Sequence, residues 1–125
     1  MATAIDWFPT VANLAGIKKI DHRIDGKDIT NLLMSAEARS PHDVFHWQTG
    51  GGKNPLWAVR KGDWKLLGNP RDTSMKAPIT PTDKLFLANL REDPTEMKNF
   101  AQQQPEVVNE LLKLHEQWVI DVKNQ

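Results

Sequence analysis

The sequence contains no cysteine and no tyrosine, and it has no excess of charge of either sign. Its 125 residues include sixteen basic and sixteen acidic residues, so the formal net charge is zero. Without cysteine, a disulfide framework, a thiolate zinc site and a thiol nucleophile are all excluded. A neutral charge balance gives no general electrostatic attraction to nucleic acid and no polybasic membrane anchor. We therefore expect neither nucleic acid nor membrane among its partners.

Long apolar runs are also missing. No stretch approaches the roughly 20 apolar residues that span a bilayer, and residues 1–16 do not have the basic-then-apolar pattern of a signal peptide. The hydrophobic fraction of 39% and the length suit one globular domain over residues 1–125. Because aromatic burial dominates the energetics of small domains, we expect most of the five tryptophans to lie in the core.

The N-terminal third shows helical spacing. Apolar residues three and four apart predict a helix over residues 5–15, with Asp6 as its N-cap and Gly16 as a left-handed C-terminal cap. The predicted inward face consists of Ile5, Phe8, Val11, Ala12 and Ala15. A second helical turn is predicted over residues 28–34, with Ile29, Leu32 and Leu33 facing inward.

The middle of the chain has strand signals. The run at residues 44–47 is aromatic and β-branched, which is typical of a strand. Two further apolar runs within residues 56–67 flank a short connection at Gly62, which predicts a β-hairpin. Alternation places Trp57 with Val59 on one face and Trp64 with Leu66 on one face. Another strand is predicted at 85–90, after a connection that is long for the interior of a domain.

Two helix starts are predicted in the C-terminal part. The segment 93–96 (DPTE) combines a capping carboxylate, a proline and a second carboxylate. Pro105 opens a longer helix, whose apolar stripe consists of Val108, Leu111, Leu112, His115, Trp118, Val119 and Val122. Hairpins followed by an amphipathic helix indicate an α+β domain, with the helix packed on one face of an antiparallel sheet.

Four segments, in order, resemble the C-terminal region of formylglycine-dependent sulfatases, of the arylsulfatase and N-acetylgalactosamine-6-sulfatase kind. They are residues 6–16 (DWFPTVANLAG), 25–33 (DGKDITNLL), 58–66 (AVRKGDWKL) and 87–101 (LANLREDPTEMKNFA). The resemblance implies a four-stranded antiparallel sheet with a long C-terminal helix on one face. It also implies a function: to brace the catalytic domain and wall its substrate cleft for sulfate-ester hydrolysis.

The residues that this family uses for chemistry have no counterparts here. The family's nucleophile lies in a Cys/Ser-x-Pro-x-Arg motif, and none of Ser35, Ser40 and Ser74 is followed by that pattern. We assign no catalytic residue and no metal ligand, and we expect calcium and formylglycine only in the catalytic domain. The chain alone is therefore expected to be inactive. As part of a full-length bacterial sulfatase it would be periplasmic or secreted.

Several residues are candidates for a site. The resemblance places His46 and Lys53 in a region that can face the catalytic pocket, and Arg60 and Lys65 are candidates for anion recognition. A solvated sheet face is the simpler interpretation of the last two residues. The candidates for an interface are Trp7, Trp57 and Trp64.

The histidines do not predict a metal site. His42 and His46 are four residues apart, but on a strand this spacing separates them by about 13 Å, too far to bind one metal ion. His115 is expected to be packed and satisfied by a neighbour. The partner is expected to be a sulfatase catalytic domain or, if the chain is a stand-alone interaction module, a second copy in a homodimer.

Overall fold

The computed structural model describes residues 1–17, 19–72, 76, 79–80 and 82–124. These residues form two compact units, Met1–Asp43 and Val44–Gln125. Each unit is described by itself, and the single domain predicted over residues 1–125 stays a prediction. In the described part of the chain, no helix is long and apolar enough to cross a membrane.

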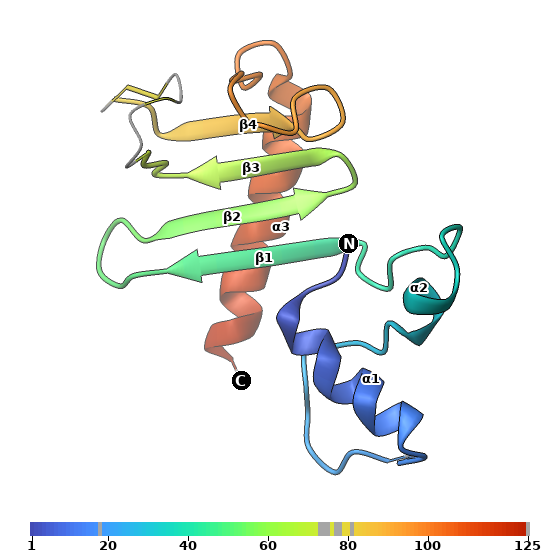
Figure 1. The fold of residues 1–125 in the computed structure, drawn as a ribbon. Helices are drawn as coiled ribbons and strands as arrows, with labels where there is room; N and C mark the ends of the chain where they lie inside the picture. The colour runs from blue at the N-terminus through green and yellow to red at the C-terminus, as the bar shows by residue number, and fades with distance from the viewer. Residues whose placement is uncertain (18, 73–75, 77–78, 81, 125) are drawn as a thin grey trace. The chain divides into compact units, whose positions relative to one another are not determined.

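The first unit contains three short helical elements, η1 (Ala4–Asp6), α1 (Trp7–Leu14) and α2 (Thr30–Met34) (Figure 1). The predicted end of α1 is confirmed, because Gly16 has a φ of +79°. The N–H of Gly16 donates to the carbonyl of Asn13, and the N–H of Ile17 donates to that of Ala12. This pair of bonds satisfies two of the last carbonyls of the helix, and it requires the left-handed glycine.

The inward face predicted for α1 is mostly wrong. Of its five residues Ala12 is buried, as predicted, whereas Ile5, Phe8, Val11 and Ala15 are exposed. Pro9 and Thr10 are buried instead. Asp6 is the N-cap residue of α1, as predicted, but its side chain makes no capping hydrogen bond. The apolar spacing was misleading because polar groups of η1 and α1, rather than large apolar side chains, hold this unit together.

The second helical turn was predicted in the right place. Of its three predicted inward residues, Ile29 is buried, Leu32 is half-buried and Leu33 is exposed. The helix has only five residues, Thr30–Met34, and none of them is buried, because the buried Ile29 precedes it as the N-cap.

The second unit is a four-stranded antiparallel sheet in the order β1-β2-β3-β4, which confirms the predicted α+β fold. Its strands are β1 (Val44–Thr49), β2 (Leu56–Lys61), β3 (Trp64–Gly68) and β4 (Leu85–Asn89). The long helix α3 (Pro105–Lys123) crosses one face of the sheet (Figure 1). Pro105 is at the start of α3, as predicted.

The core of this unit lies between the sheet and α3. The sheet contributes Val59, Leu66 and Leu87, which are fully buried, and α3 contributes Val108 and Leu111. Trp57 and Trp64 pack against the same cluster. The alternation predicted for the hairpin is therefore confirmed, since both tryptophans share the α3 face with Val59 and Leu66.

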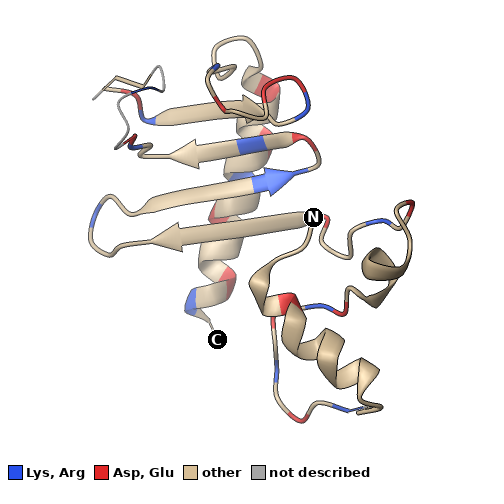
Figure 2. Cartoon of the chain, in the orientation of Figure 1, with Lys and Arg blue, Asp and Glu red and all other residues tan. Residues whose placement is uncertain are grey.

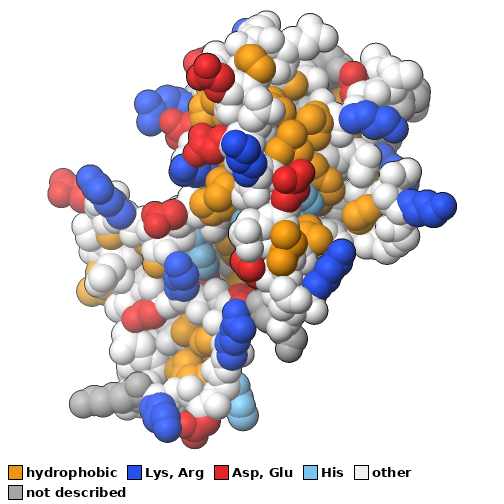
Figure 3. Space-filling model, turned by 180° about the vertical axis from the view of Figure 1, so that it is seen from behind, with side chains coloured by type: hydrophobic (Ala, Val, Ile, Leu, Met, Phe, Trp, Pro, Cys, Tyr) orange, Lys and Arg blue, Asp and Glu red, His pale blue; other side chains and the backbone are white. Residues whose placement is uncertain are grey.

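Two predictions for the C-terminal part are wrong. No helix begins at 93–96; instead the Asp93 carboxylate accepts hydrogen bonds from the Thr95 hydroxyl and the Lys98 N–H, and Glu96 has a φ of +56°. The same side chain that suits a helix start closes a turn here. Val122, predicted to lie on the buried stripe of α3, is exposed. Figure 3 views the α3 side, where hydrophobic side chains lie between charged ones.

Gly62 tests the backbone requirement of the β2–β3 hairpin. It has a φ of +57°, and a Cβ at this position would meet nothing within 4 Å. A Gly62→Val substitution is therefore penalised by conformation and not by collision, and we expect a loss of about 1 kcal/mol or more. Urea unfolding measures it. Gly51→Val is the matched control, because Gly51 is equally open but has no positive φ. Equal midpoints for the two variants would contradict the prediction.

Candidate functional site

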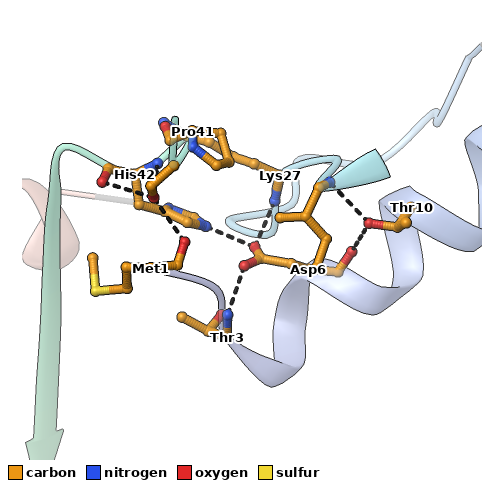
Figure 4. A network of polar contacts seen from close by, with 9 residues as sticks. Met1, Thr3, Asp6, Thr10, Lys27, Pro41 and His42 are labelled. Carbon is orange, nitrogen blue, oxygen red and sulfur yellow. Dashed lines mark hydrogen bonds and ion pairs between the residues drawn. The ribbon is translucent and has the colours of Figure 1, made fainter. Parts of the chain in front are cut away.

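The first unit is organised around Asp6, whose side chain is fully buried. One carboxylate oxygen, Oδ1, accepts the N–H of Lys27 at 2.9 Å and contacts His42 Nε2 at 2.7 Å. The other, Oδ2, accepts the N–H of Thr3 at 2.8 Å. Figure 4 shows that these partners come from three separate segments of the unit. One side chain thus joins the N-terminus, the 25–29 loop and the segment before β1.

Thr10 extends this network from α1. Its hydroxyl donates to the backbone carbonyl of Asp6 at 2.6 Å and accepts the N–H of Ile29 at 3.0 Å. Gly26 lies so close to η1 that a Cβ there would be 2.0 Å from the carbonyl oxygen of Ile5. The loop that carries Gly26, Lys27 and Ile29 is therefore held tightly against η1 and α1 by polar contacts.

The pKa of Asp6 is lowered. Burial alone would raise it, but hydrogen bonds from the N–H groups of Lys27 and Thr3, with the hydrogen bond and charge of His42, lower it by more. The carboxylate therefore stays ionised at neutral pH, as an acceptor for all three partners. It is a structural anion, since every oxygen that could act on a substrate is already bound inside the unit.

Large apolar side chains of α1 and of the residues next to it are exposed. We call this set the α1 apolar surface, and each member is between 47% and 65% exposed: Ile5, Trp7, Phe8, Val11, Leu14 and Ile17. The helix itself contains no Lys, Arg, Asp or Glu (Figure 2). Exposed apolar patches of this kind mark interaction sites in folded proteins. The predicted interface residue Trp7 belongs to it, together with residues that had been assigned to the core.

The four predicted substrate-binding residues do not meet at one place. His46 is half-buried on β1, and its ring stacks on Trp118 of α3 at 5.1 Å. Lys53 is exposed in the β1–β2 connection. Arg60 and Lys65 are direct cross-strand partners on β2 and β3. Arg60 follows Val59 on β2, and Lys65 precedes Leu66 on β3. Since successive side chains of a strand point to opposite faces, both cations occupy the face of the sheet away from α3.

The two cations on that face differ in their partners. Lys65 Nζ binds both carboxylate oxygens of Glu96, at 2.7 and 2.8 Å. Arg60 donates from Nε to the carbonyl of Gly62 at 3.1 Å, and among the described residues no carboxylate forms an ion pair with it. Of this pair, Arg60 is the one that could still bind an anion. Substrate contact by any of the four residues stays a prediction.

The two hairpin tryptophans are half-buried within their own unit. Trp57 stacks on His115 with ring centroids 3.9 Å apart, and Trp64 meets Phe100 edge-on at 5.8 Å. A role for either residue in an interface stays a prediction. His115 is buried as predicted, but its Nδ1 has no hydrogen-bond partner among the described residues.

The described residues do not fit a metal ion. His42 is bound to Asp6 in the first unit, whereas His46 stacks under α3 in the second. Across the described part of the chain, no group of three or more His, Cys, Asp or Glu side chains is placed to hold a metal. A calcium ion would need six to eight oxygen ligands, and the expectation that calcium belongs to the catalytic domain stays a prediction.

Comparisons with known proteins identify its relatives. Bovine arylsulfatase A (Bos taurus) is 28% identical over 125 residues, which cover 90% of this chain. An uncharacterized sulfatase of Schizosaccharomyces pombe is 24% identical over 127 residues, covering 94% of it. The chain is a sulfatase homologue. Its similarity is that expected of a sulfatase C-terminal domain, although no model of a protein family matches it.

The solved structures agree with this assignment. A structure from a Bacteroides thetaiotaomicron genetic locus for the metabolism of multiple glycosaminoglycans matches 96% of the sulfatase homologue, with 26% identity and a TM-score of 0.65. The homologue spans only 24% of that chain. It likewise spans 25% of bovine arylsulfatase A and 20% of the S. pombe sulfatase. It thus corresponds to a minor part of each relative.

In the Asp6→Asn variant of the sulfatase homologue, the first unit should unfold more easily than in the unsubstituted chain. The amide would place an NH₂ group against one of the N–H or ring donors that now face a carboxylate, and leaving such buried groups unsatisfied costs about 1–3 kcal/mol each. Cleavage by trypsin at Arg23 and Lys27 measures the opening. Asp21→Asn is the control, because Asp21 is exposed and pairs with exposed Lys19. Equal cleavage rates in both variants would show that the network is dispensable.

Proposed function

We propose that this chain is the C-terminal domain of a sulfatase, that it braces the catalytic domain and walls its substrate cleft, and that it is inactive alone. The observation that carries the proposal is the α1 apolar surface. The sequence relationship to sulfatases supports the family, and the exposed helix supports a partner that is not part of this chain.

The size of the surface suits an interface between domains. Its six side chains are each about half exposed, and a whole aromatic side chain presents roughly 150–250 Å². Together they offer several hundred Å², comparable with one side of interfaces that bury about 600–1,500 Å² within a chain. A monomer that needs no partner rarely exposes a larger patch. Since the relatives are four to five times longer than this chain, the rest of a sulfatase could supply the opposing face.

The chemistry of the surface indicates a permanent contact. Because α1 contains no charged residue, ion pairs from this helix cannot guide or hold a partner. Obligate interfaces are more apolar than transient ones and resemble a domain core cut in half. We therefore propose that the opposing face is apolar and uncharged, and that it belongs to the catalytic domain.

The proposed contribution to the cleft rests on the cations of the second unit. Lys53 and Arg60 have no carboxylate partner among the described residues, so both could bind the anionic sulfate of a substrate. Lys65 is the weaker candidate because Glu96 already neutralises it. His46 is turned toward α3 and would contribute through the packing of β1.

The isolated chain should hydrolyse no aryl sulfate. It contains no residue in the Cys/Ser-x-Pro-x-Arg context from which formylglycine arises, and its described residues do not fit calcium. The assay includes calcium and a formylglycine-generating enzyme, with an intact sulfatase as the positive control. Turnover that survives repurification would contradict the proposal.

A chimaera tests the bracing role. The chain replaces the matching quarter of the Bacteroides relative, and we expect the chimaera to fold and to regain sulfatase activity that the truncated relative lacks. Phe8→Asp in the α1 apolar surface should abolish that gain, because an unpaired carboxylate cannot be buried against an apolar face. Ile120→Asp is the control, since Ile120 is similarly exposed but lies on α3. Equal activity of the two variants would show that α1 is not part of the interface with the catalytic domain.

Self-association is the second candidate, and the same surface favours it. If the chain is a stand-alone interaction module, two copies can cover their α1 apolar surfaces through a two-fold interface. Sedimentation at micromolar concentration then shows a dimer that Phe8→Asp dissociates. A monomer by sedimentation together with a rescued chimaera would favour the bracing role over the homodimer.

A further inference from the structure

A second feature lies under α3 and is independent of the α1 apolar surface. We call it the histidine–tryptophan cluster, and it consists of His46, Trp57, His115 and Trp118. The ring centroids of His46 and Trp118 are 5.1 Å apart, with an interplanar angle of 6°. The ring centroids of His115 and Trp57 are 3.9 Å apart, with an interplanar angle of 12°. The two imidazoles are themselves 6.3 Å apart. The cluster therefore joins the later part of α3 to β1 and β2.

Each of the two histidines has one buried ring nitrogen without a hydrogen-bond partner among the described residues. In both His46 and His115 this nitrogen is Nδ1. No carboxylate of the described residues forms an ion pair with either ring. An imidazole in this setting packs well as a neutral ring, but its protonated form has no counter-ion and no new acceptor.

We propose that the histidine–tryptophan cluster is an acid-sensitive latch, which holds the later part of α3 on β1 and β2 at neutral pH and releases it when the two imidazoles are protonated. The proposal does not depend on the role proposed for the chain in a sulfatase. It concerns only contacts within the Val44–Gln125 unit.

Both imidazoles have a lowered pKa. Burial, with the charge of His115 acting in the same sense, lowers the pKa of His46 to about 4. Burial also lowers the pKa of His115, while Glu116 on α3 partly opposes that shift. The facing positions of β2, Trp57 and Val59, carry no charge. In the unfolded chain a histidine titrates near 6.5.

The sign of the pH dependence follows from these shifts. Between about pH 6.5 and 4 the unfolded or detached state binds more protons than the packed state, so the packed state loses stability as the pH falls. The full contribution is present above about pH 6.5. Because the two rings are close, a proton on one disfavours a proton on the other while α3 stays packed, and detachment relieves both.

Amide hydrogen exchange on the full chain tests the latch. After correction for intrinsic exchange rates, protection of residues 111–123 should fall about tenfold or more from pH 7 to pH 5, since each proton taken up only by the detached state contributes tenfold per pH unit. In the double variant His46→Phe/His115→Phe, which keeps aromatic rings but cannot titrate, this fall should be lost. His22→Gln is the control, because His22 is an exposed histidine of the first unit and should leave the fall unchanged.

Direct titration keeps the proposal falsifiable if the double variant folds poorly. In the unsubstituted chain, the NMR signals of the His46 and His115 ring protons should titrate with midpoints below pH 6, in step with the loss of α3 protection. Midpoints at or above pH 6.5 would overturn the latch. So would equal protection of α3 at pH 7 and pH 5, or a fall that persists unchanged in a folded double variant.

Discussion

The buried carboxylate of Asp6 is the interaction on which the first unit depends. A unit of this length buries few apolar side chains, and among its described residues these are Pro9, Ala12 and Ile29. What replaces an apolar core is a set of hydrogen bonds that all end on Asp6 or Thr10. Because these bonds hold η1, α1 and the 25–29 loop together, the large side chains of α1 are free to point outward.

The second unit is built on the opposite principle. Its sheet and α3 enclose fully buried aliphatic side chains, and the aromatic residues pack around them. Here the polar groups that matter are few, and the histidine–tryptophan cluster is the place where titratable atoms enter the apolar layer. One chain thus combines a polar-centred unit that displays apolar surface with an apolar-centred unit that conceals two titratable rings.

The parts that were predictable from sequence are those that depend on local periodicity. Alternation found the β2–β3 hairpin and its inward tryptophans, and spacing with Pro105 found α3. The α1 face could not be found this way, because periodicity shows where apolar residues gather but not whether anything in the chain covers them. The stacking of His46 on Trp118 was equally hidden, since it joins positions 72 residues apart in the sequence. The helix start predicted at Asp93 was wrong because the same carboxylate can cap a helix or close a turn.

An uncharged helix with exposed large side chains also has consequences for how much of the protein can persist in a cell. Copies that meet no partner leave the α1 apolar surface open to other unfolded or unassembled chains, and such surfaces promote aggregation and recognition by chaperones. Covered copies present no such target. On the proposal that a partner covers α1, the steady amount of this chain should follow the supply of that partner, so that abundance is controlled by assembly and not by the rate of synthesis alone.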